Sequence, residues 1–413
     1  MKILAITAFF PPYHSGGYEI RVKNILDELS LRGHEILVLT NNPKAKHHIN
    51  TPTSNLRIVR KLHDRRTAKF FLKEILFDLE DTSLVEKAIE QFKPEVIYLG
   101  HTYVFSKAIL PFISRLKTPV AYDEGGSGLI EAWTEHGRWF RFTSNYRSRF
   151  AFLNMIKPFV IKALCKFSHG RIQTSWAWPE RIRIFFNSEL NRHNALTNGV
   201  PIEGSEIIHS GIETTLFTYK PRTQFHFPLQ IFAPGRIERR KGQVDAIKLV
   251  KILNDNGLEA RLTLAGSNWV DGYYNEVLEE IRLNGLNDKI NILPMLTTVE
   301  LIKEYQKADI CLFPSYFRTG FSRVPLEAMA CGCILISYGN EGSIEVIQDR
   351  ETGFVVKPGD LNHMFNIIEE LGSARQSIKK VTVAARQEIE ARFSMPDYID
   401  QIERALIRTV VSS

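Results

Sequence analysis

The sequence of 413 residues has few cysteines, no long apolar run and no Asp-x-Asp motif, and each absence excludes a class of protein. Its four cysteines, at positions 165, 311, 331 and 333, are too few and too clustered for a disulfide framework. No apolar run approaches the ~18 residues of a membrane-spanning helix, so we expect no such helix. Residues 1–10 read as a strand without a small-residue cleavage site, which predicts a cytoplasmic protein without a signal peptide.

Composition and charge are those of a soluble globular protein. Hydrophobic residues make up 44% of the chain and charged residues 24%, and the length allows two domains with separate cores. Lysine and arginine number 53 against 46 acidic residues, which gives a net charge of +7. This moderate excess fits an anionic ligand or an anionic membrane face. It does not by itself indicate nucleic acid, and we expect no such partner.

A strand, loop, helix and strand are predicted in succession over residues 310–337. Residues 310–313 are apolar, and the helix is expected to open near Val324 and Pro325 and to close at Gly332. Proline suits a first helical turn because its missing N–H would be unpaired there, and glycine suits a helix end. The loop before the helix therefore directs free N–H groups beyond the strand tips, where an anion is the natural ligand.

Glu327 is expected in the first turn of this predicted helix. A carboxylate there would repel a phosphate placed on the helix axis, but it could accept hydrogen bonds from sugar hydroxyls beside that phosphate. Alternatively, Glu327 only caps the helix. The sequence leaves both interpretations open.

A basic loop follows the strand predicted over residues 230–233. Four cations stand within six positions, namely Arg236, Arg239, Arg240 and Lys241. At a strand-to-helix connection, such a loop is expected to bind an anion. Arg236 can hold two phosphate oxygens at once, whereas Lys241 supplies a mobile point charge. The alternative is a basic loop that is merely solvated.

The segment from Pro314 to Gly332 resembles the signature of the family 4 retaining glycosyltransferases. These are α/β proteins of the GT-B arrangement, with two Rossmann-like domains facing across a central cleft. The matching residues are Pro314, Ser315, Gly320, Phe321, Val324, Pro325, Glu327, Ala328, Met329, Ala330, Cys331 and Gly332. Thr319 stands in the slot of the family's first glutamate, and Ser322 replaces its second loop glycine.

Two further segments are similar to the same family. Residues 3–40 read as a strand, the pair Gly16-Gly17, a helix and a second strand, which is how the family begins. The glycine pair permits close approach to a phosphate or sugar, although a tight turn is the alternative. Gly235-Arg236 followed by Lys241-Gly242 is similar to the family's donor-diphosphate motif.

The resemblance implies a donor site for a nucleotide-diphosphate sugar. The implied members are Gly16, Gly17, Arg236, Lys241, Leu296, Thr319, Gly320, Phe321, Ser322, Arg323, Val324 and Glu327. Among them Glu327 would hold the ribose, Leu296 would meet the base, and the backbone of residues 320–324 would meet the diphosphate and the transferred sugar. Arg236 and Lys241 are the expected catalytic cations, with Asp123 as a third catalytic candidate.

Acceptor-side candidates follow two strands predicted over residues 95–99 and 119–121. His101 comes after the first, and Asp123 and Glu124 come after the second. Functional groups of open α/β sheets gather beyond the carboxyl ends of strands, so these three side chains are expected to line the cleft. Alternatively, Asp123 and Glu124 belong to a solvated loop.

Further along the chain, a helix is predicted over residues 179–186.

A basic and aromatic segment spans residues 138–171. It holds eight lysines and arginines, and no acid occurs between Glu135 and Glu180. Such a segment could rest on an anionic lipid surface, as an enzyme acting on a lipid-linked acceptor would require. The preferred alternative is that its aromatic residues, among them Phe159 and Phe167, belong to the core.

The predicted organisation is an N-terminal acceptor-side domain over residues 1–215, a linker over 216–229 and a nucleotide-sugar-binding domain over 230–393. Residues 394–413 are expected to form a helix that crosses back to the N-terminal domain. The boundaries of these segments are predicted from composition and from turn-forming residues.

The predicted function is retaining transfer of a sugar to a hydroxyl of a glycan or lipid-linked acceptor, in cell-surface polysaccharide or glycolipid synthesis. Without an Asp-x-Asp motif to hold a divalent ion, we expect no metal and no cofactor. Because Thr319 replaces a glutamate, same-face attack is favoured over a covalent intermediate. Two alternatives are a nucleotide-sugar isomerase or phosphorylase and an inactive nucleotide-sugar-binding protein.

Overall fold

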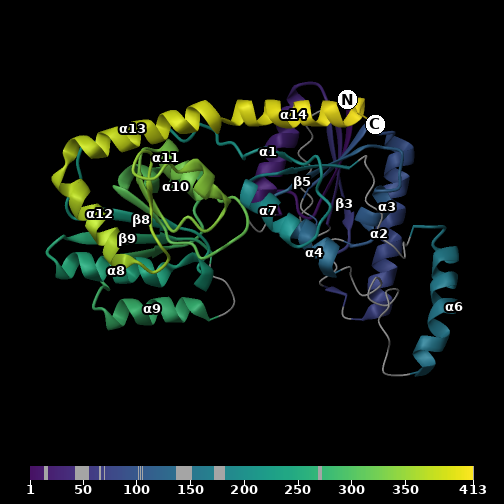
Figure 1. The fold of residues 1–413 in the computed structure, drawn as a ribbon, viewed down its shortest axis with the longest axis horizontal. Helices are drawn as coiled ribbons and strands as arrows, with labels where there is room; N and C mark the ends of the chain where they lie inside the picture. The colour runs from purple at the N-terminus through teal and green to yellow at the C-terminus, as the bar shows by residue number, and fades with distance from the viewer. Residues whose placement is uncertain are drawn as a thin grey trace. The chain divides into compact units, whose positions relative to one another are not determined.

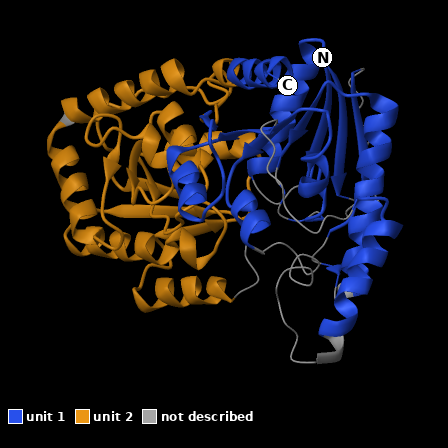
Figure 2. Cartoon of the chain, turned by 45° about the vertical axis from the view of Figure 1, so that its right-hand side comes forward, with its two compact units in different colours: residues 1–208, 399–413 blue, residues 209–398 orange. Residues whose placement is uncertain are grey.

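The computed structural model describes residues 1–13, 17–41, 55–64, 67–68, 70–100, 102, 104, 106–135, 151–171, 182–267 and 272–412. The chain divides into two compact units, drawn in different colours in Figure 2. Unit 1 comprises Met1–Ile208 with Ile399–Ser413, and unit 2 comprises His209–Tyr398. The predicted linker over 216–229 therefore falls inside unit 2. Each unit contains a parallel sheet, so the predicted α/β class is confirmed.

Unit 1 is built on a seven-stranded sheet in the order β3-β2-β1-β4-β5-β6-β7. The strands are β1 (Lys2–Thr7), β2 (Glu35–Asn41), β3 (Leu56–Leu62), β4 (Val96–Leu99), β5 (Val120–Glu124), β6 (Ile182–Phe186) and β7 (Glu206–Ile207). All neighbouring strands run parallel, and Ile3 pairs with both Ile36 and Val96. Central strands such as β1 are almost wholly apolar because a parallel sheet of this kind is buried on both faces.

The helices of unit 1 are labelled in Figure 1. They are α1 (Gly17–Leu31), α2 (Phe71–Phe92), α3 (Ile109–Ile113), α4 (Gly128–Glu135), α6 (Ala151–Phe167) and α7 (Glu189–Thr197). Helix α1 buries Val22, Ile25 and Leu29, which recur at helical spacing on one face. No helix in the described part of the chain is both long enough and apolar enough to cross a membrane.

The helix predicted over residues 179–186 is wrong where the structure describes it. Residues Ile182–Phe186 form strand β6, which pairs with β5 in register from Val120↔Ile182 to Glu124↔Phe186. The strand is rich in β-branched and aromatic residues, which favour a pleated and buried surface. Pairing with β5 then satisfies its backbone groups.

Unit 2 is built on a six-stranded sheet in the order β10-β9-β8-β11-β12-β13. The strands are β8 (Leu229–Pro234), β9 (Ala260–Ala265), β10 (Ile290–Leu293), β11 (Ile310–Phe313), β12 (Ile334–Ser337) and β13 (Phe354–Val355). Strands β8 and β11 are parallel neighbours, with Ile231 opposite Ile310. The loops that leave their carboxyl ends are therefore brought together at one edge of the sheet.

The remaining elements of unit 2 cover this sheet or connect its strands. They are η2 (Arg239–Lys241), α8 (Gln243–Asp255), α9 (Tyr273–Leu283), α10 (Thr298–Lys307), α11 (Arg323–Ala330), η3 (Gly342–Val346), α12 (Leu361–Ser373) and α13 (Arg375–Arg392). Helix α8 buries Ile247, Val250 and Leu253 at helical spacing. These side chains join the main apolar core of the unit.

The last helix, α14 (Met395–Val411), begins in unit 2, and its residues from 399 onward belong to unit 1. It buries Ile399, Ile402 and Leu406 on one face. Near the end of α1, Arg32 Nη1 lies 2.6 Å from Glu403 Oε2, and His34 Nε2 lies 2.7 Å from Glu403 Oε1. Apolar packing and this ionic cluster together hold α14 on unit 1.

Candidate functional site

Two loops of unit 2 pack against each other at the carboxyl ends of β8 and β11. We call residues 235–242 the basic loop and residues 314–322 the helix-entry loop. Gly242 has φ +69°, and a Cβ added there would lie 2.2 Å from the carbonyl oxygen of Pro314. Only glycine permits this conformation together with this approach. The Tyr316 N–H also donates to the carbonyl of Arg240 at 2.8 Å.

Lys241 lies between aromatic rings and a buried carboxylate. Its Nζ is 5.1 Å from the ring centre of Phe313, 4.9 Å from that of Phe317 and 3.7 Å from Glu341 Oε1. The side chain is 16% exposed, so the ammonium is not a freely solvated charge. Cation–π attraction and the ion pair fix its position at the helix-entry loop.

The other three cations of the basic loop have different partners. Arg236 Nη2 lies 3.3 Å from Glu238 Oε1, and its backbone carbonyl accepts a hydrogen bond from Gln243 at 2.9 Å. Arg239 pairs with Glu276, and the Arg240 guanidinium lies 4.0 Å from the ring centre of Phe317. The four cations therefore do not act as one solvated cluster.

Helix α11 begins with a serine cap. Ser322 is its N-cap residue, and the Ser322 Oγ accepts from the Val324 N–H at 3.4 Å. Glu327 is 6% exposed and is held instead by the Tyr305 hydroxyl at 3.0 Å and by Arg323 Nε at 3.1 Å. The interpretation of Glu327 as a simple cap is therefore wrong, whereas its contact with a ribose stays a prediction.

The remaining donor candidates are spread over both units. Gly320, at φ +92°, accepts a hydrogen bond from the Gly342 N–H at 3.0 Å, and Thr319 and Phe321 are half-buried beside it. Leu296 is half-buried after β10. Gly17 opens helix α1 in unit 1. Gly16 lies outside the described residues. The expected cleft between two facing domains stays a prediction.

Glu341 is a further candidate, and it belongs to none of the motifs described above. It precedes η3 and is 4% exposed. Burial raises the pKa of its carboxyl, while Lys241 and hydrogen bonds from the Ser315 side chain and the Ser322 backbone lower it. The one available sequence signal was its position just beyond strand β12, the same rule that selected Asp123.

The acceptor-side candidates Asp123 and Glu124 are both buried in strand β5, so the solvated-loop alternative is wrong. Asp123 Oδ1 accepts a hydrogen bond from Arg21 at 2.9 Å, and its Oδ2 accepts from the Tyr98 hydroxyl at 2.5 Å. Glu124 accepts from the Leu129 N–H at 2.6 Å at the start of α4. A role toward an acceptor stays a prediction for both. His101 lies outside the described residues.

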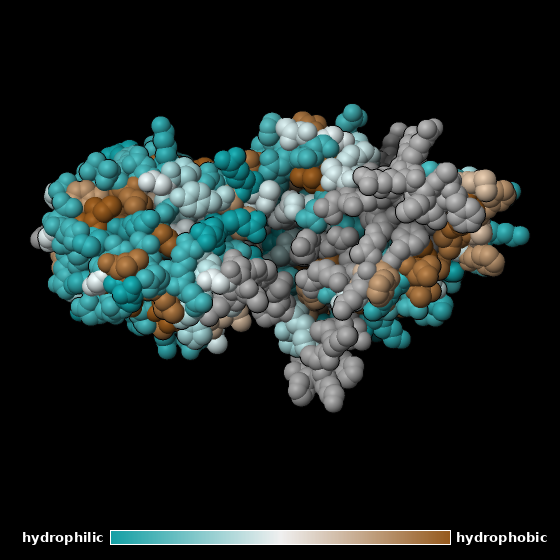
Figure 3. Space-filling view, turned by 90° about the horizontal axis from the view of Figure 1, so that it is seen from below, coloured by the Kyte–Doolittle hydropathy of each residue, from teal (hydrophilic) through white to brown (hydrophobic). Residues whose placement is uncertain are grey.

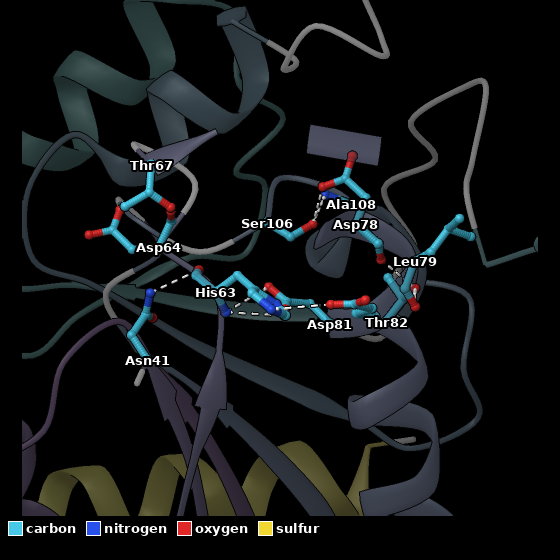
Figure 4. Close-up of polar contacts among 11 residues, drawn as sticks. Asn41, His63, Asp64, Thr67, Asp78, Leu79, Asp81, Thr82, Ser106 and Ala108 are labelled. Carbon is cyan, nitrogen blue, oxygen red and sulfur yellow. Dashed lines mark hydrogen bonds and ion pairs between the residues drawn. The ribbon is translucent and has the colours of Figure 1, made fainter. Parts of the chain in front are cut away.

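A second polar cluster, missed by the sequence analysis, surrounds His63 at the end of β3 (Figure 4). His63 Nδ1 lies 2.7 Å from Asp81 Oδ1, its Nε2 lies 3.1 Å from Glu80 Oε2, and its carbonyl accepts from Asn41 at 2.9 Å. The hydrogen bond to Asp81 raises the pKa of His63. A cavity of about 440 Å³ adjoins the cluster. Both ring nitrogens lie beside carboxylates, so Asp81 and Glu80 neutralise the charge of a protonated His63.

Helix α6 exposes apolar side chains that were expected in the core. Phe159 is 75% exposed and Phe167 is 77% exposed, so the core interpretation is wrong for both. Figure 3 shows exposed hydrophobic groups at the right-hand end of its view, within unit 1. Residues 138–150 of the basic segment lie outside the described residues. Contact with an anionic membrane stays a prediction.

The chain is similar in sequence to known glycosyltransferases. Residues 221–388 match the family described as Glycosyl transferases group 1. The chain is 26% identical over 226 residues to the amylovoran biosynthesis glycosyltransferase AmsK of Erwinia amylovora, which covers 54% of this chain and 55% of AmsK. This match therefore spans about half of that relative. Glycogen synthase of Mycobacterium tuberculosis is 21% identical over 407 residues, covering 95% of this chain and 91% of that protein.

Solved structures resemble the chain over its full length. Sucrose-phosphate synthase from Thermosynechococcus elongatus matches with a TM-score of 0.73 at 18% identity, covering 100% of both chains. HepE of Anabaena, solved in complex with UDP-glucose, matches with a TM-score of 0.67 at 19% identity, covering 99% of this chain and 100% of HepE.

The two parallel α/β units and these full-length matches define a protein of the GT-B fold. Within that class, residues 221–388, which we call the family segment, match the group 1 glycosyltransferases, and this segment lies wholly in unit 2.

Proposed function

We propose that the chain transfers a sugar, with retention and without a metal ion, from a nucleotide-diphosphate sugar to a hydroxyl of a glycan or lipid-linked acceptor. The observation that carries the proposal is the position of Lys241, fixed at the helix-entry loop beside the start of α11. The departing diphosphate gains negative charge, and Lys241, Arg236 and the N–H groups before α11 would stabilise it. The capsular polysaccharide biosynthesis glycosyltransferase CapM of Staphylococcus aureus is 26% identical over 169 residues, which fits a cell-surface glycan as product.

The donor would lie along the carboxyl edge of the unit 2 sheet. Glu327 would hold the ribose, and Leu296 would meet the base. Arg236 and Lys241 would take the place that a divalent ion has in other transferases, and the sequence contains no Asp-x-Asp motif to bind such an ion. UDP-glucose is the first donor to test, because HepE binds it on the same fold.

Retention would come from same-face attack. The acceptor oxygen forms a bond to the anomeric carbon as the bond from that carbon to the phosphate oxygen breaks, and the hydroxyl proton passes to the departing diphosphate. Thr319, in the helix-entry loop, offers no carboxylate nucleophile for a covalent intermediate. Asp123 and Glu124 would support the acceptor side indirectly. Asp123 accepts a hydrogen bond from Arg21 of α1, and Glu124 accepts one from the Leu129 N–H of α4, so both carboxylates hold a helix against β5.

Product analysis tests this function. UDP-glucose and other nucleotide sugars are incubated with a panel of glycan and lipid-linked acceptors, with and without EDTA. We expect release of the nucleoside diphosphate and a glycoside with the donor's anomeric configuration, at a rate that EDTA leaves unchanged. An inverted product, or loss of turnover in EDTA, would contradict the mechanism. An isomerised sugar formed from donor alone would favour the isomerase alternative.

We also propose that α6 contacts an anionic membrane when the acceptor is a lipid. The helix carries Lys157, Lys162 and Lys166 together with the exposed Phe159 and Phe167. Aromatic side chains can enter the headgroup region while lysines meet anionic lipids.

Vesicle co-sedimentation tests the membrane contact. Binding to vesicles rich in phosphatidylglycerol is expected at low salt and should fall when Phe159 and Phe167 are both changed to serine. Leu278→Ser, an exposed apolar residue of α9 in unit 2, is the matched control and should leave binding unchanged. Equal binding by all variants, or none by the wild type, would contradict the proposal.

A further inference from the structure

The carboxylate of Glu341 is buried, and one of its oxygens is unsatisfied. Among the residues that the structure describes, Glu341 Oε1 has no hydrogen-bond partner, and Lys241 Nζ faces it from 3.7 Å. A buried acceptor without a donor is costly in free energy, because the desolvation of the oxygen is not offset by a hydrogen bond. Such an arrangement calls for a reason other than the stability of the fold.

The backbone around Glu341 is tied to the helix-entry loop on both sides. Asn340 Nδ2 donates to the carbonyl of Ser315 at 3.2 Å, and the Gly342 N–H donates to the carbonyl of Gly320 at 3.0 Å. The Ser322 backbone at the start of α11 also faces the Glu341 carboxylate. These contacts hold Glu341 where the basic loop, the helix-entry loop and α11 meet.

This place is the proposed site of the donor diphosphate, where a second anion is unfavourable by charge alone. A carboxylate within reach of phosphate oxygens repels them, and it does so strongly in a partly buried site. Its presence is compensated only by ligand groups that donate hydrogen bonds. A nucleotide sugar carries such groups, because sugar hydroxyls adjoin the diphosphate. A nucleoside diphosphate has none at that end.

We propose that Glu341 accepts a hydrogen bond from a hydroxyl of the sugar to be transferred, and that it makes the site prefer a nucleotide sugar over its nucleoside diphosphate. This inference rests on the proposed function and adds a specificity residue to it. The same carboxylate holds the Lys241 ammonium beside the phosphates through their ion pair. Glu341 thereby favours entry of the substrate and release of the product.

Calorimetric titration of the wild type and of Glu341→Gln tests the inference. The probe pair is the nucleotide sugar that most stabilises the wild type in a thermal-shift screen beginning with UDP-glucose, together with its nucleoside diphosphate. The variant should bind the nucleotide sugar about tenfold more weakly, because a hydrogen bond to a charged group is lost. Affinity for the nucleoside diphosphate should stay the same or rise, because a negative charge is removed.

The ratio of the two affinities separates this role from others. A parallel loss of both affinities would indicate a purely structural role and would overturn the inference. A parallel gain would indicate that Glu341 only competes with phosphate, and would also overturn it. If neither affinity changes, the inference is overturned as well.

Glu345→Gln is the matched control. Glu345 lies in the same 3-10 helix, and its carboxylate pairs with His209 at 2.8 Å. Its neutralisation should leave the ratio of affinities unchanged, and an equal change in both variants would overturn the inference. Should Glu341→Gln fail to fold, Glu341→Asp keeps the charge and shortens the reach, so the ratio should again fall.

Failure of the proposed function gives a different result. If the wild type binds no nucleotide sugar and no nucleoside diphosphate, the proposed function fails and this inference falls with it. If the wild type binds and turns over a nucleotide sugar while Glu341→Gln keeps the wild-type ratio, the function stands and the role of Glu341 is wrong.

Discussion

Gly242 shows how closely the two site loops approach each other. Its positive φ and the 2.2 Å separation between an added Cβ and the Pro314 oxygen restrict the position to glycine. Gly257 also has a positive φ, at +80°, but nothing lies within 4 Å of a Cβ added there. The two glycines therefore separate the cost of backbone conformation from the cost of the loop contact.

Gly257→Ala is expected to lower the free energy of unfolding by about 1 kcal/mol, because alanine tolerates a positive φ poorly. Gly242→Ala adds a steric clash and should cost about 3 kcal/mol. It should also weaken nucleotide-sugar binding. Denaturant unfolding and thermal-shift binding measure both effects. Equal losses in the two variants would show that the basic loop does not press on Pro314.

His63 is a residue whose protonation should be tied to the fold. The hydrogen bond to Asp81 raises its pKa above the usual 6.5. Because the folded-state pKa is raised, the stabilisation is fully present below about pH 6.5 and is lost as pH rises through the folded pKa. Proton NMR of the imidazole should show this raised pKa.

Asp81→Asn should lower the pKa of His63 more than Glu80→Gln does, since Asp81 is the larger cause and is buried. Glu80 contributes only its charge and is exposed. A titration curve that is the same in Asp81→Asn and in the wild type would contradict the assignment of the ion pair.

At the scale of elements, local sequence signals predicted the strand, helix and strand that surround the helix-entry loop. The expected strand, helix and strand are found as β11, α11 and β12, because Ser322 caps the helix start, Pro325 suits its first turn and Gly332 follows its C-cap residue. The residues of β6 were misread as a helix because their place is decided by pairing with β5, which lies far away in the sequence.

The same distinction applies to the site. Lys241 could be identified from four clustered cations, since the signal is local. Glu341 could not, because its burial arises when the segments around Gly320 and Gly342 meet. The ion pair between Arg21 and Asp123 joins residues that no short motif connects. Interactions between distant segments therefore limit what a single sequence reveals.

Helix α14 contacts the segment after α1 through two acids, Asp400 and Glu403, and Arg32 Nη1 lies 2.6 Å from Asp400 Oδ1. Glu403 accepts hydrogen bonds from His34 and Arg32, and these partners lower its pKa, with His34 as the larger cause. Stability from this group is therefore present above the ordinary glutamate pKa and is lost as pH falls through the lowered value.

Glu403→Gln should reduce the free energy of unfolding at pH 7 by about 1 kcal/mol, because the network is partly exposed and solvent weakens it. Glu390→Gln removes the ion pair between the exposed Glu390 and Arg386, which also donates to three backbone carbonyls, and should cost only about 0.3 kcal/mol. Denaturant unfolding compares the two. An equal effect would show that Glu403 does not anchor the helix.

At the scale of the whole molecule, the two units carry different kinds of information. Unit 2 holds all of the family segment and the loops of the candidate donor site. Unit 1 holds a buried polar network around Asp123, a partly exposed one around His63, and exposed apolar side chains on α6. The proposed donor site therefore rests on local motifs in unit 2. The proposed acceptor side would depend on the surface of unit 1, which no motif specifies.

The most direct test of the account is the rate of sugar transfer by Lys241→Ala. With the donor found in the screen, kcat/KM should fall about 100-fold or more, as when one preorganised group facing a developing charge is removed. Arg239→Ala removes a neighbouring cation that pairs with Glu276 and should stay within about twofold of the wild type. Wild-type turnover by Lys241→Ala, or an equal loss in both variants, would contradict the assignment of Lys241 to the diphosphate.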